Sequence, residues 1–98
     1  MTMNNNSLSI TDALVAYLRE NGLEQSVLEA QVEEAWPKVM GDIVTSLTRS
    51  VEVKDGLLIV RVSSAALKAQ LFENRFELVA KLNEAVGANV VKDCRILG

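Results

Sequence analysis

Apolar residues recur every three or four positions through the first half of the chain, which is the period of an α-helix. A first helix is expected to begin at Ser9 or Thr11, either of which can cap it, with Asp12 close to the positive end of the helix dipole. The adjacent Asn21 and Gly22 predict its end, because glycine readily adopts the left-handed conformation found after helices. The apolar stripe of this helix comprises Ile10, Leu14, Tyr17 and Leu18.

A second helical segment is expected from about Gln25 to Leu47, and it contains Trp36 and Pro37, the only tryptophan and the only proline of the chain. A proline inside a helix costs roughly 3 kcal/mol. Either Pro37 starts a new helix, where its missing N–H costs nothing, or one long helix kinks just before it. The apolar spacing continues through the proline, which favours a kink or a tight helix–helix joint. The stripe comprises Leu28, Val32, Ala35, Trp36, Val39, Ile43 and Leu47.

This stripe predicts that Trp36, Val39 and Ile43 face one core. An indole ring can also serve as a platform on which nucleic-acid bases stack, but the position of Trp36 on the apolar stripe favours a packing role. Gly41 lies on the flank of the stripe, where the absence of a side chain would allow a close backbone approach.

The apolar period changes to two in residues 49–54 and in part of residues 57–62, which indicates two strands. Asp55 and Gly56 lie between them, and this dipeptide is a strong signal for a two-residue β-hairpin. The expected cross-strand pairs are Val53–Leu58, Val51–Val60 and Arg49–Val62. One face of the hairpin is expected to be buried, and it consists of Val51, Val53, Leu58, Val60 and Val62. The other face is mixed, and it consists of Ser50, Glu52, Lys54, Leu57, Ile59 and Arg61.

Ser63 or Ser64 is expected to cap a long third helix that ends at residue 86, just before a glycine. Its apolar arc comprises Leu67, Leu71, Phe72, Leu78, Val79, Leu82 and Val86. Arg75 falls in the middle of this arc, and burying an unpaired charge is costly. The side chain therefore either extends to the edge of the arc, pairs with an acid such as Glu33 or Asp42, or contacts a ligand or partner.

These elements define an α+β fold class of two layers, in the order α-α-β-β-α-β, with a three-stranded sheet and helices on one face. The final strand is expected from Val90 to Leu97, with Cys94 and Ile96 facing inward. The helix before it allows this strand to run parallel to a neighbour. The outline is KH-like. Ninety-eight residues make a single domain, expected over residues 9–98 after a frayed polar tail at residues 1–8.

The composition limits the class of protein. Hydrophobic residues make up 49% and charged residues 23% of the chain, as in compact soluble proteins. The first residues, MTMNNNSLS, have neither the basic start nor the apolar run of a secretory signal. No apolar stretch approaches the roughly 18 residues of a membrane span, and the single cysteine excludes an intramolecular disulfide. We therefore expect a cytoplasmic protein that makes no membrane contact.

Residue types that catalysis requires are scarce. The chain has no histidine, the commonest general base and metal ligand, and the lone Cys94 cannot form a thiolate metal cluster. No phosphate-binding loop or dinucleotide fingerprint is present. Glu29, Glu33 and Glu34 can be read as paired carboxylates, but a solvated helix face is the simpler interpretation. We therefore expect neither an enzyme nor a bound cofactor or metal.

The net charge of −3 is unevenly distributed. Residues 1–48 carry seven acids and two bases, net −5, whereas residues 49–98 carry eight bases and six acids, net +2. Because phosphates are bound mostly by clustered Lys and Arg, one hypothesis is weak binding of single-stranded DNA or RNA by the second half. The GXXG loop of KH domains is missing, since no two glycines lie three apart. A further hypothesis is a homodimer through Leu57 and Ile59, although unpartnered exposed apolar residues are common.

One series of residues carries a family resemblance over roughly residues 10–97, namely Trp36, Val39, Gly41, Ile43, Gly56, Leu58, Val60, Val62, Ser64, Leu71, Arg75, Leu82, Asn83, Gly87, Val91 and Ile96. In order and spacing this series resembles the bacterial DciA-like family, long catalogued as a domain of unknown function. The resemblance implies a KH-like, non-enzymatic adaptor that interacts with the replicative helicase in DNA replication and promotes its loading onto DNA. The candidate partner or nucleic-acid contacts are Leu57, Ile59, Arg61, Lys68 and Arg75.

Overall fold

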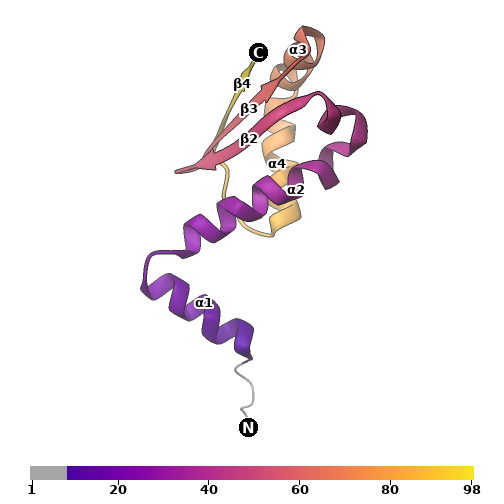
Figure 1. Cartoon of the computed structure of the whole chain (residues 1–98). Helices are drawn as coiled ribbons and strands as arrows, with labels where there is room; N and C mark the ends of the chain where they lie inside the picture. The colour runs from indigo at the N-terminus through magenta and orange to yellow at the C-terminus, as the bar shows by residue number, and fades with distance from the viewer. Residues whose placement is uncertain (1–8) are drawn as a thin grey trace.

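The structure, a computed structural model, describes residues 9–98 (Figure 1). Its elements in chain order are α1 (Ile10–Glu20), α2 (Glu24–Ser46), β2 (Thr48–Lys54), β3 (Leu57–Val62), α3 (Ala65–Glu73), α4 (Arg75–Val86) and β4 (Asp93–Leu97). The strands form one sheet in the order β2-β3-β4, with α2, α3 and α4 packed against one of its faces. The predicted two-layer α+β class with a three-stranded sheet is confirmed. The expected polar tail, residues 1–8, lies outside the described residues.

The hairpin forms as its turn sequence predicts. Asp55 and Gly56 have φ values of 53° and 82°, and two successive positive φ angles are the mark of the type I′ turn that suits the twist of paired strands. The pairs Val53–Leu58 and Val51–Val60 are both observed. The expected pairing of Arg49 with Val62 is wrong, because the register shifts between Thr48 and Ser50 and places Thr48 opposite Val62. Arg49 is the extra residue of this bulge.

The third strand runs parallel to β3, as the intervening helical crossover predicts. β4 begins later than expected, at Asp93, and the residues before it form a loop. Asn83 of α4 holds this loop: its Oδ1 accepts hydrogen bonds from Val90 N at 3.1 Å and Val91 N at 2.8 Å, and its Nδ2 donates to Val91 O at 2.9 Å. Both valines are buried. Within the strand, Ile96 is buried and Cys94 is half-buried, so both inward assignments are confirmed.

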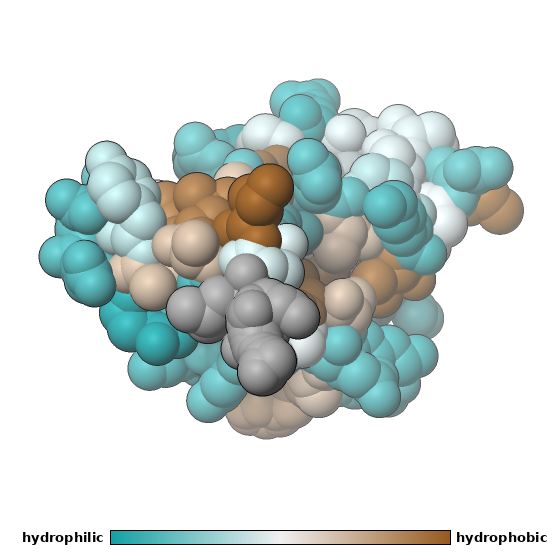
Figure 2. Space-filling view, turned by 90° about the horizontal axis from the view of Figure 1, so that it is seen from below, coloured by the Kyte–Doolittle hydropathy of each residue, from teal (hydrophilic) through white to brown (hydrophobic). Residues whose placement is uncertain are grey.

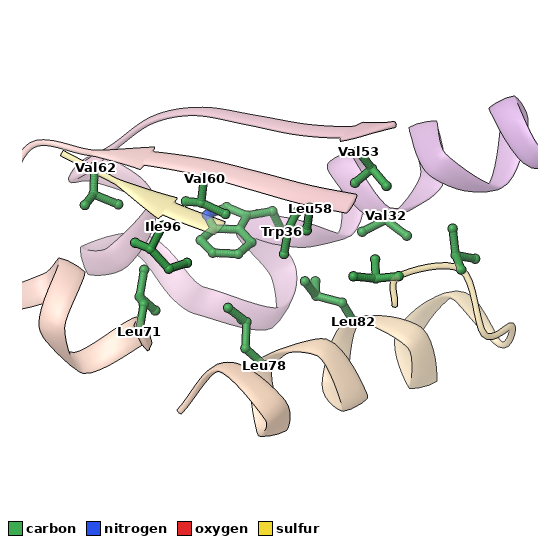
Figure 3. Close-up of a cluster of buried hydrophobic side chains, with 12 residues drawn as sticks. Val32, Trp36, Val53, Leu58, Val60, Val62, Leu71, Leu78, Leu82 and Ile96 are labelled. Carbon is green, nitrogen blue, oxygen red and sulfur yellow. The ribbon is translucent and has the colours of Figure 1, made fainter. Parts of the chain in front are cut away.

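Trp36 lies at the centre of the core, between the sheet and the helix layer (Figure 3). Its side chain is only 1% exposed, and its Nε1 donates a hydrogen bond to Thr48 Oγ1 at 3.2 Å. Thr48 Oγ1 in turn donates to Val44 O at 2.7 Å, which ties the start of β2 to the end of α2. The prediction that Trp36 packs in the core is confirmed. The other buried apolar residues are Val32, Val53, Leu58, Val60, Val62, Leu71, Leu78, Leu82, Val90, Val91 and Ile96.

Helix α2 passes through Pro37 and breaks four residues later, at Gly41. Gly41 has φ 85° and ψ 175°, a combination that is essentially restricted to glycine. The expectation that Pro37 starts a new helix is therefore wrong, and the interruption of α2 lies at Gly41. The expected close backbone approach at Gly41 is also wrong, because an added Cβ would meet no atom within 4 Å. The break ends the apolar stripe: Val39 is half-buried, whereas Ile43 is 79% exposed instead of facing the core.

The expected long third helix is two helices, α3 and α4, separated at Asn74. Ser64 caps α3 by accepting a hydrogen bond from Leu67 N at 3.1 Å, which confirms one of the two predicted caps. Asn74 has φ −106° and ψ 21°, and its Nδ2 donates to Gln70 O at 2.8 Å. Asparagine side chains compete with the backbone for such bonds and so favour helix ends. Phe72, expected on the apolar arc, is exposed.

Candidate partner-binding surfaces

The outer face of the sheet, opposite the helices, presents three cross-strand rows of side chains. The sheet register aligns them as Lys54–Leu57–Asp93, Glu52–Ile59–Arg95 and Ser50–Arg61–Leu97. Leu57 and Ile59 lie half-buried in the central strand, and Arg61 continues their column as an exposed base. The predicted contacts Leu57, Ile59 and Arg61 therefore share one surface, which we call the outer sheet face.

The charges of the outer sheet face alternate in sign around its apolar column. A base and an acid flank Leu57, and an acid and a base flank Ile59. Three bases against two acids give this face a net charge of only +1. Such a surface lacks the clustered positive charge that phosphate binding requires. An apolar centre inside a rim of mixed charge is instead the usual composition of a protein–protein interface.

Arg75 lies at the joint between α3 and α4, where its guanidinium stacks on two aromatic rings. The Arg75 Cζ atom is 4.2 Å from the centroid of Phe72 and 4.7 Å from that of Phe76, which are cation–π distances. The Arg75 Nη1 also donates to Phe72 O at 2.9 Å. No acid pairs with it within residues 9–98, so the expected pairing with Glu33 or Asp42 is wrong.

Phe72 and Phe76 are both exposed, and Phe76 reaches 77%. Lys68 precedes Phe72 by one helical turn and lies on the same side of α3. We call Lys68, Phe72, Arg75 and Phe76 the helix-joint patch. The five predicted contacts are thus divided: Lys68 and Arg75 belong to this patch and not to the outer sheet face. Sequence reasoning missed the exposed phenylalanines, although the helix-breaking tendency of Asn74 is a signal that could have revealed them.

A groove adjoins the helix-joint patch between α4 and β4, and Arg75, Phe76, Val79, Lys92, Asp93 and Cys94 line it. The pKa of the Cys94 thiol is raised to about 11, mainly by burial and also by the neighbouring Asp93 charge, while Arg75 acts to lower it. A thiol with this pKa stays protonated at neutral pH and is a poor nucleophile. The thiol in this groove is therefore not poised for nucleophilic chemistry.

The acids of α2 are largely structural. Glu29 is buried, and its Oε2 accepts hydrogen bonds from Gly56 N at 3.1 Å and Gln25 Nε2 at 2.7 Å. Glu33 Oε2 accepts from Val53 N at 2.9 Å. The expectation of a solvated face is therefore wrong for Glu29 and Glu33 and correct only for Glu34, which is exposed. Both carboxylates are occupied by the hairpin and are not poised as an acid–base pair.

Nowhere in residues 9–98 do three or more Asp, Glu or Cys side chains gather as they would around a metal ion. None of the helices in this range combines the length and the apolar character needed to cross a membrane. The features that stand out are thus the two surfaces, the outer sheet face and the helix-joint patch.

The fold and these surfaces define a small two-layer α+β domain with exposed apolar and basic side chains suited to binding a partner. Its family follows from comparison with known sequences. The family model described as "Dna[CI] antecedent, DciA" matches residues 9–96, and the chain belongs to the DciA family.

Several relatives from Rhodococcus, Mycobacterium and Mycolicibacterium carry the name UPF0232 protein. The chain is 32% identical over 83 residues to such a protein of Rhodococcus jostii, a match that covers 85% of this chain and 44% of the relative. It is 32% identical over 80 residues to one of Mycobacterium tuberculosis, covering 82% of this chain and 43% of the relative. The chain therefore spans less than half the length of these relatives.

Proposed function

We propose that this chain is a non-enzymatic adaptor that binds the replicative helicase in the bacterial cytoplasm. The observation that carries the proposal is the match to the DciA family over residues 9–96. The arrangement of the side chains supports a binding role. The carboxylates of Glu29 and Glu33 on α2 are engaged by the hairpin, and the one thiol has a pKa raised to about 11.

We place the helicase contact on the outer sheet face. Leu57 and Ile59 form its apolar centre, and Arg61 adds an exposed base at the end of the same column. Buried apolar centres with a polar rim provide most of the affinity in protein interfaces. Lys68 and Arg75 lie on the helix-joint patch and are expected to contribute less to this contact.

A binding assay with the purified replicative helicase of the same bacterium tests the proposal. We expect micromolar affinity, and we expect Ile59→Gln and Arg61→Glu each to weaken it by about tenfold or more. Lys38→Glu is the matched control for Arg61→Glu, because it reverses an exposed base on α2, away from this face. Absence of binding at micromolar concentrations would reject the adaptor function. Equal losses in Arg61→Glu and Lys38→Glu would reject the surface.

Weak binding of single-stranded nucleic acid is the second candidate function, and one observation favours it. The helix-joint patch combines two exposed aromatic rings with Arg75 and Lys68, the residue types on which single-stranded DNA or RNA stacks. The net charge of −3 opposes it. Titration of a labelled oligonucleotide at low salt measures this binding, which must weaken as salt is added.

A further inference from the structure

Four charged side chains on the outer sheet face make no ion pair in the part of the chain that the structure describes. Lys54 and Glu52 lie on β2, and Asp93 and Arg95 lie across from them on β4. All four are exposed. Asp93 Oδ1 accepts a hydrogen bond from Cys94 N at 2.8 Å, but no base neutralises its charge. The four charges are therefore available to a partner.

These charges alternate in sign at the corners of a rectangle around the apolar column of β3. In the first row a base on β2 faces an acid on β4, and in the second row an acid on β2 faces a base on β4. The sign also reverses from one row to the next along each strand. Half a turn about an axis in this plane, parallel to either side of the rectangle, therefore places each charge over one of opposite sign. Such self-complementarity is what a twofold dimer requires.

Arg61 decides between the two possible axes. An axis along β3 would stack Arg61 on the Arg61 of a second copy, and like charges in contact are unfavourable. An axis across the strands, midway between Leu57 and Ile59, stacks Leu57 of one copy on Ile59 of the other. It also carries Arg61 past the apolar column to the hairpin turn of the other copy, where Asp55 is exposed. The axis across the strands therefore leaves no two like charges in contact.

The spacing of packed sheets suits these contacts. Sheets that pack face to face lie about 10 Å apart, a distance that two long charged side chains pointing toward each other can bridge. Their strands cross at about 30° because each sheet is twisted, and over three short strands this rotation shifts facing side chains by only a few ångströms. At the usual strand spacing the patch measures about 15 by 17 Å, which is small for a stable interface. We therefore expect a weak dimer.

We propose that the outer sheet face binds the same face of a second copy of this chain, with the strands of the two sheets antiparallel. Lys54 of each copy lies over Glu52 of the other, and Asp93 of each lies over Arg95 of the other. The twofold axis makes each ion pair twice, around an apolar centre. This dimer does not rest on helicase binding. Because the helicase contact is proposed for the same face, the dimer and the helicase complex exclude each other.

Helix α1 is the other exposed apolar surface through which copies could associate. It buries none of its residues, and Ile10 is 90% and Leu14 is 53% exposed. Figure 2 views the molecule from the α1 end and shows hydrophobic surface open among hydrophilic residues. An apolar stripe without a matching charge pattern does not specify what covers it, so α1 is the alternative that a test of the dimer must separate.

Sedimentation equilibrium of the full chain without helicase, at concentrations up to about 1 mM, tests the dimer. We expect a monomer–dimer equilibrium that weakens as salt is added. Lys54→Glu and Glu52→Lys each place like charges over one another, and each should weaken dimerisation by about tenfold or more. Lys38→Glu is the matched control, because it reverses an exposed base on α2, away from this face. Circular dichroism checks that each variant is folded.

Exchanging the two charges isolates the pairing itself. The double variant, Lys54→Glu with Glu52→Lys, restores opposite charges across the strands, so dimerisation should return. Mixing the two single variants should also give a dimer, because one variant supplies two acids and the other supplies two bases. An axis along β3 predicts no gain in either case, since the changed residues would then face Asp93 and Arg95.

Four outcomes would overturn the proposal. They are a wild-type monomer at all concentrations, equal losses in Lys54→Glu and Lys38→Glu, no recovery by exchange or mixing, and loss of the dimer in an α1 variant, Ile10→Gln with Leu14→Gln. The last would assign self-association to α1. Failure of the helicase assay would leave this equilibrium unchanged, so the two proposals are tested separately. If both hold, adding helicase should dissociate the dimer.

Discussion

Helices α1 and α2 carry the same kind of apolar stripe, but the stripe is exposed in α1 and leads into the core in α2. In α2 the stripe leads to Trp36, which is 1% exposed and hydrogen-bonded to the first residue of β2. In α1 the stripe ends in Leu18, which is half-buried, and its other members, including Tyr17, are exposed. The comparison shows that amphipathic spacing predicts a helix and the face that needs covering, but does not identify the surface that covers it.

The largest expected difference between the two helices is in stability. Trp36→Ala removes a fully buried ring and should lower the free energy of unfolding by about 3–5 kcal/mol. Tyr17→Ala removes an exposed ring and should change it by no more than about 0.5 kcal/mol at concentrations low enough for the chain to be monomeric. Urea unfolding measures both values. A similar loss in the two variants would mean that α1 is packed against its own domain.

A smaller effect is expected at the break that ends the buried stripe of α2. Gly41→Ala should cost about 1–3 kcal/mol through backbone strain alone, because an added Cβ meets no neighbour. Pro37→Ala should stabilise the chain by up to about 2 kcal/mol, since alanine gains helix propensity and loses part of that gain through the unfolded state. Thermal unfolding measures both changes in stability, and opposite signs for the two variants would confirm that Gly41 causes the interruption of the helix. A loss of stability in Pro37→Ala would instead show that Pro37 causes it.

The smallest effect concerns Cys94. Its side chain is half-buried, so its exposure lies between that of Tyr17 on α1 and that of Trp36 on α2. Its pKa is raised from 9.0 to about 11, so alkylation at pH 8 should be about a hundredfold slower in the folded than in the unfolded chain. The folded state holds the thiol proton more tightly, so the stability that Cys94 contributes is complete below pH 9 and declines between pH 9 and about 11. A Cys94→Ala variant should lack this part of the alkaline loss. Equal alkylation rates in both states would show that the thiol is open to solvent.

The local signals in the sequence were sufficient for the hairpin and for the parallel last strand. The turn is encoded by two adjacent residues, Asp55 and Gly56, and the register follows from it. The break at Asn74 could not be predicted from the apolar pattern, because Leu71 and Leu78 keep helical spacing across it and both are buried. The kink was expected at position 37 because proline disfavours a helix interior. The unusual backbone conformation lies at Gly41 instead.

The candidate surfaces were harder to predict because they depend on contacts between distant parts of the chain. The roles of Leu57, Ile59 and Arg61 could be assigned to one face because strand alternation places them there. Phe72 could not be placed in the same way, because it lies at the edge of the apolar arc, where the helical period does not separate buried from exposed positions. Glu29 was misassigned for a related reason: its hydrogen-bond partner, the N–H of Gly56, lies 27 residues away.

The carboxylates of Glu29 and Glu33 have a consequence for how this sheet behaves in a crowded solution. A strand at the edge of a sheet presents free N–H groups that can recruit a strand from another molecule and begin a fibre. On the outer edge of β2, the N–H of Val53 and that of the following turn at Gly56 are already occupied by these two side chains. Helix α2 thus shields the turn end of this sheet edge from strand addition while leaving the outer sheet face open.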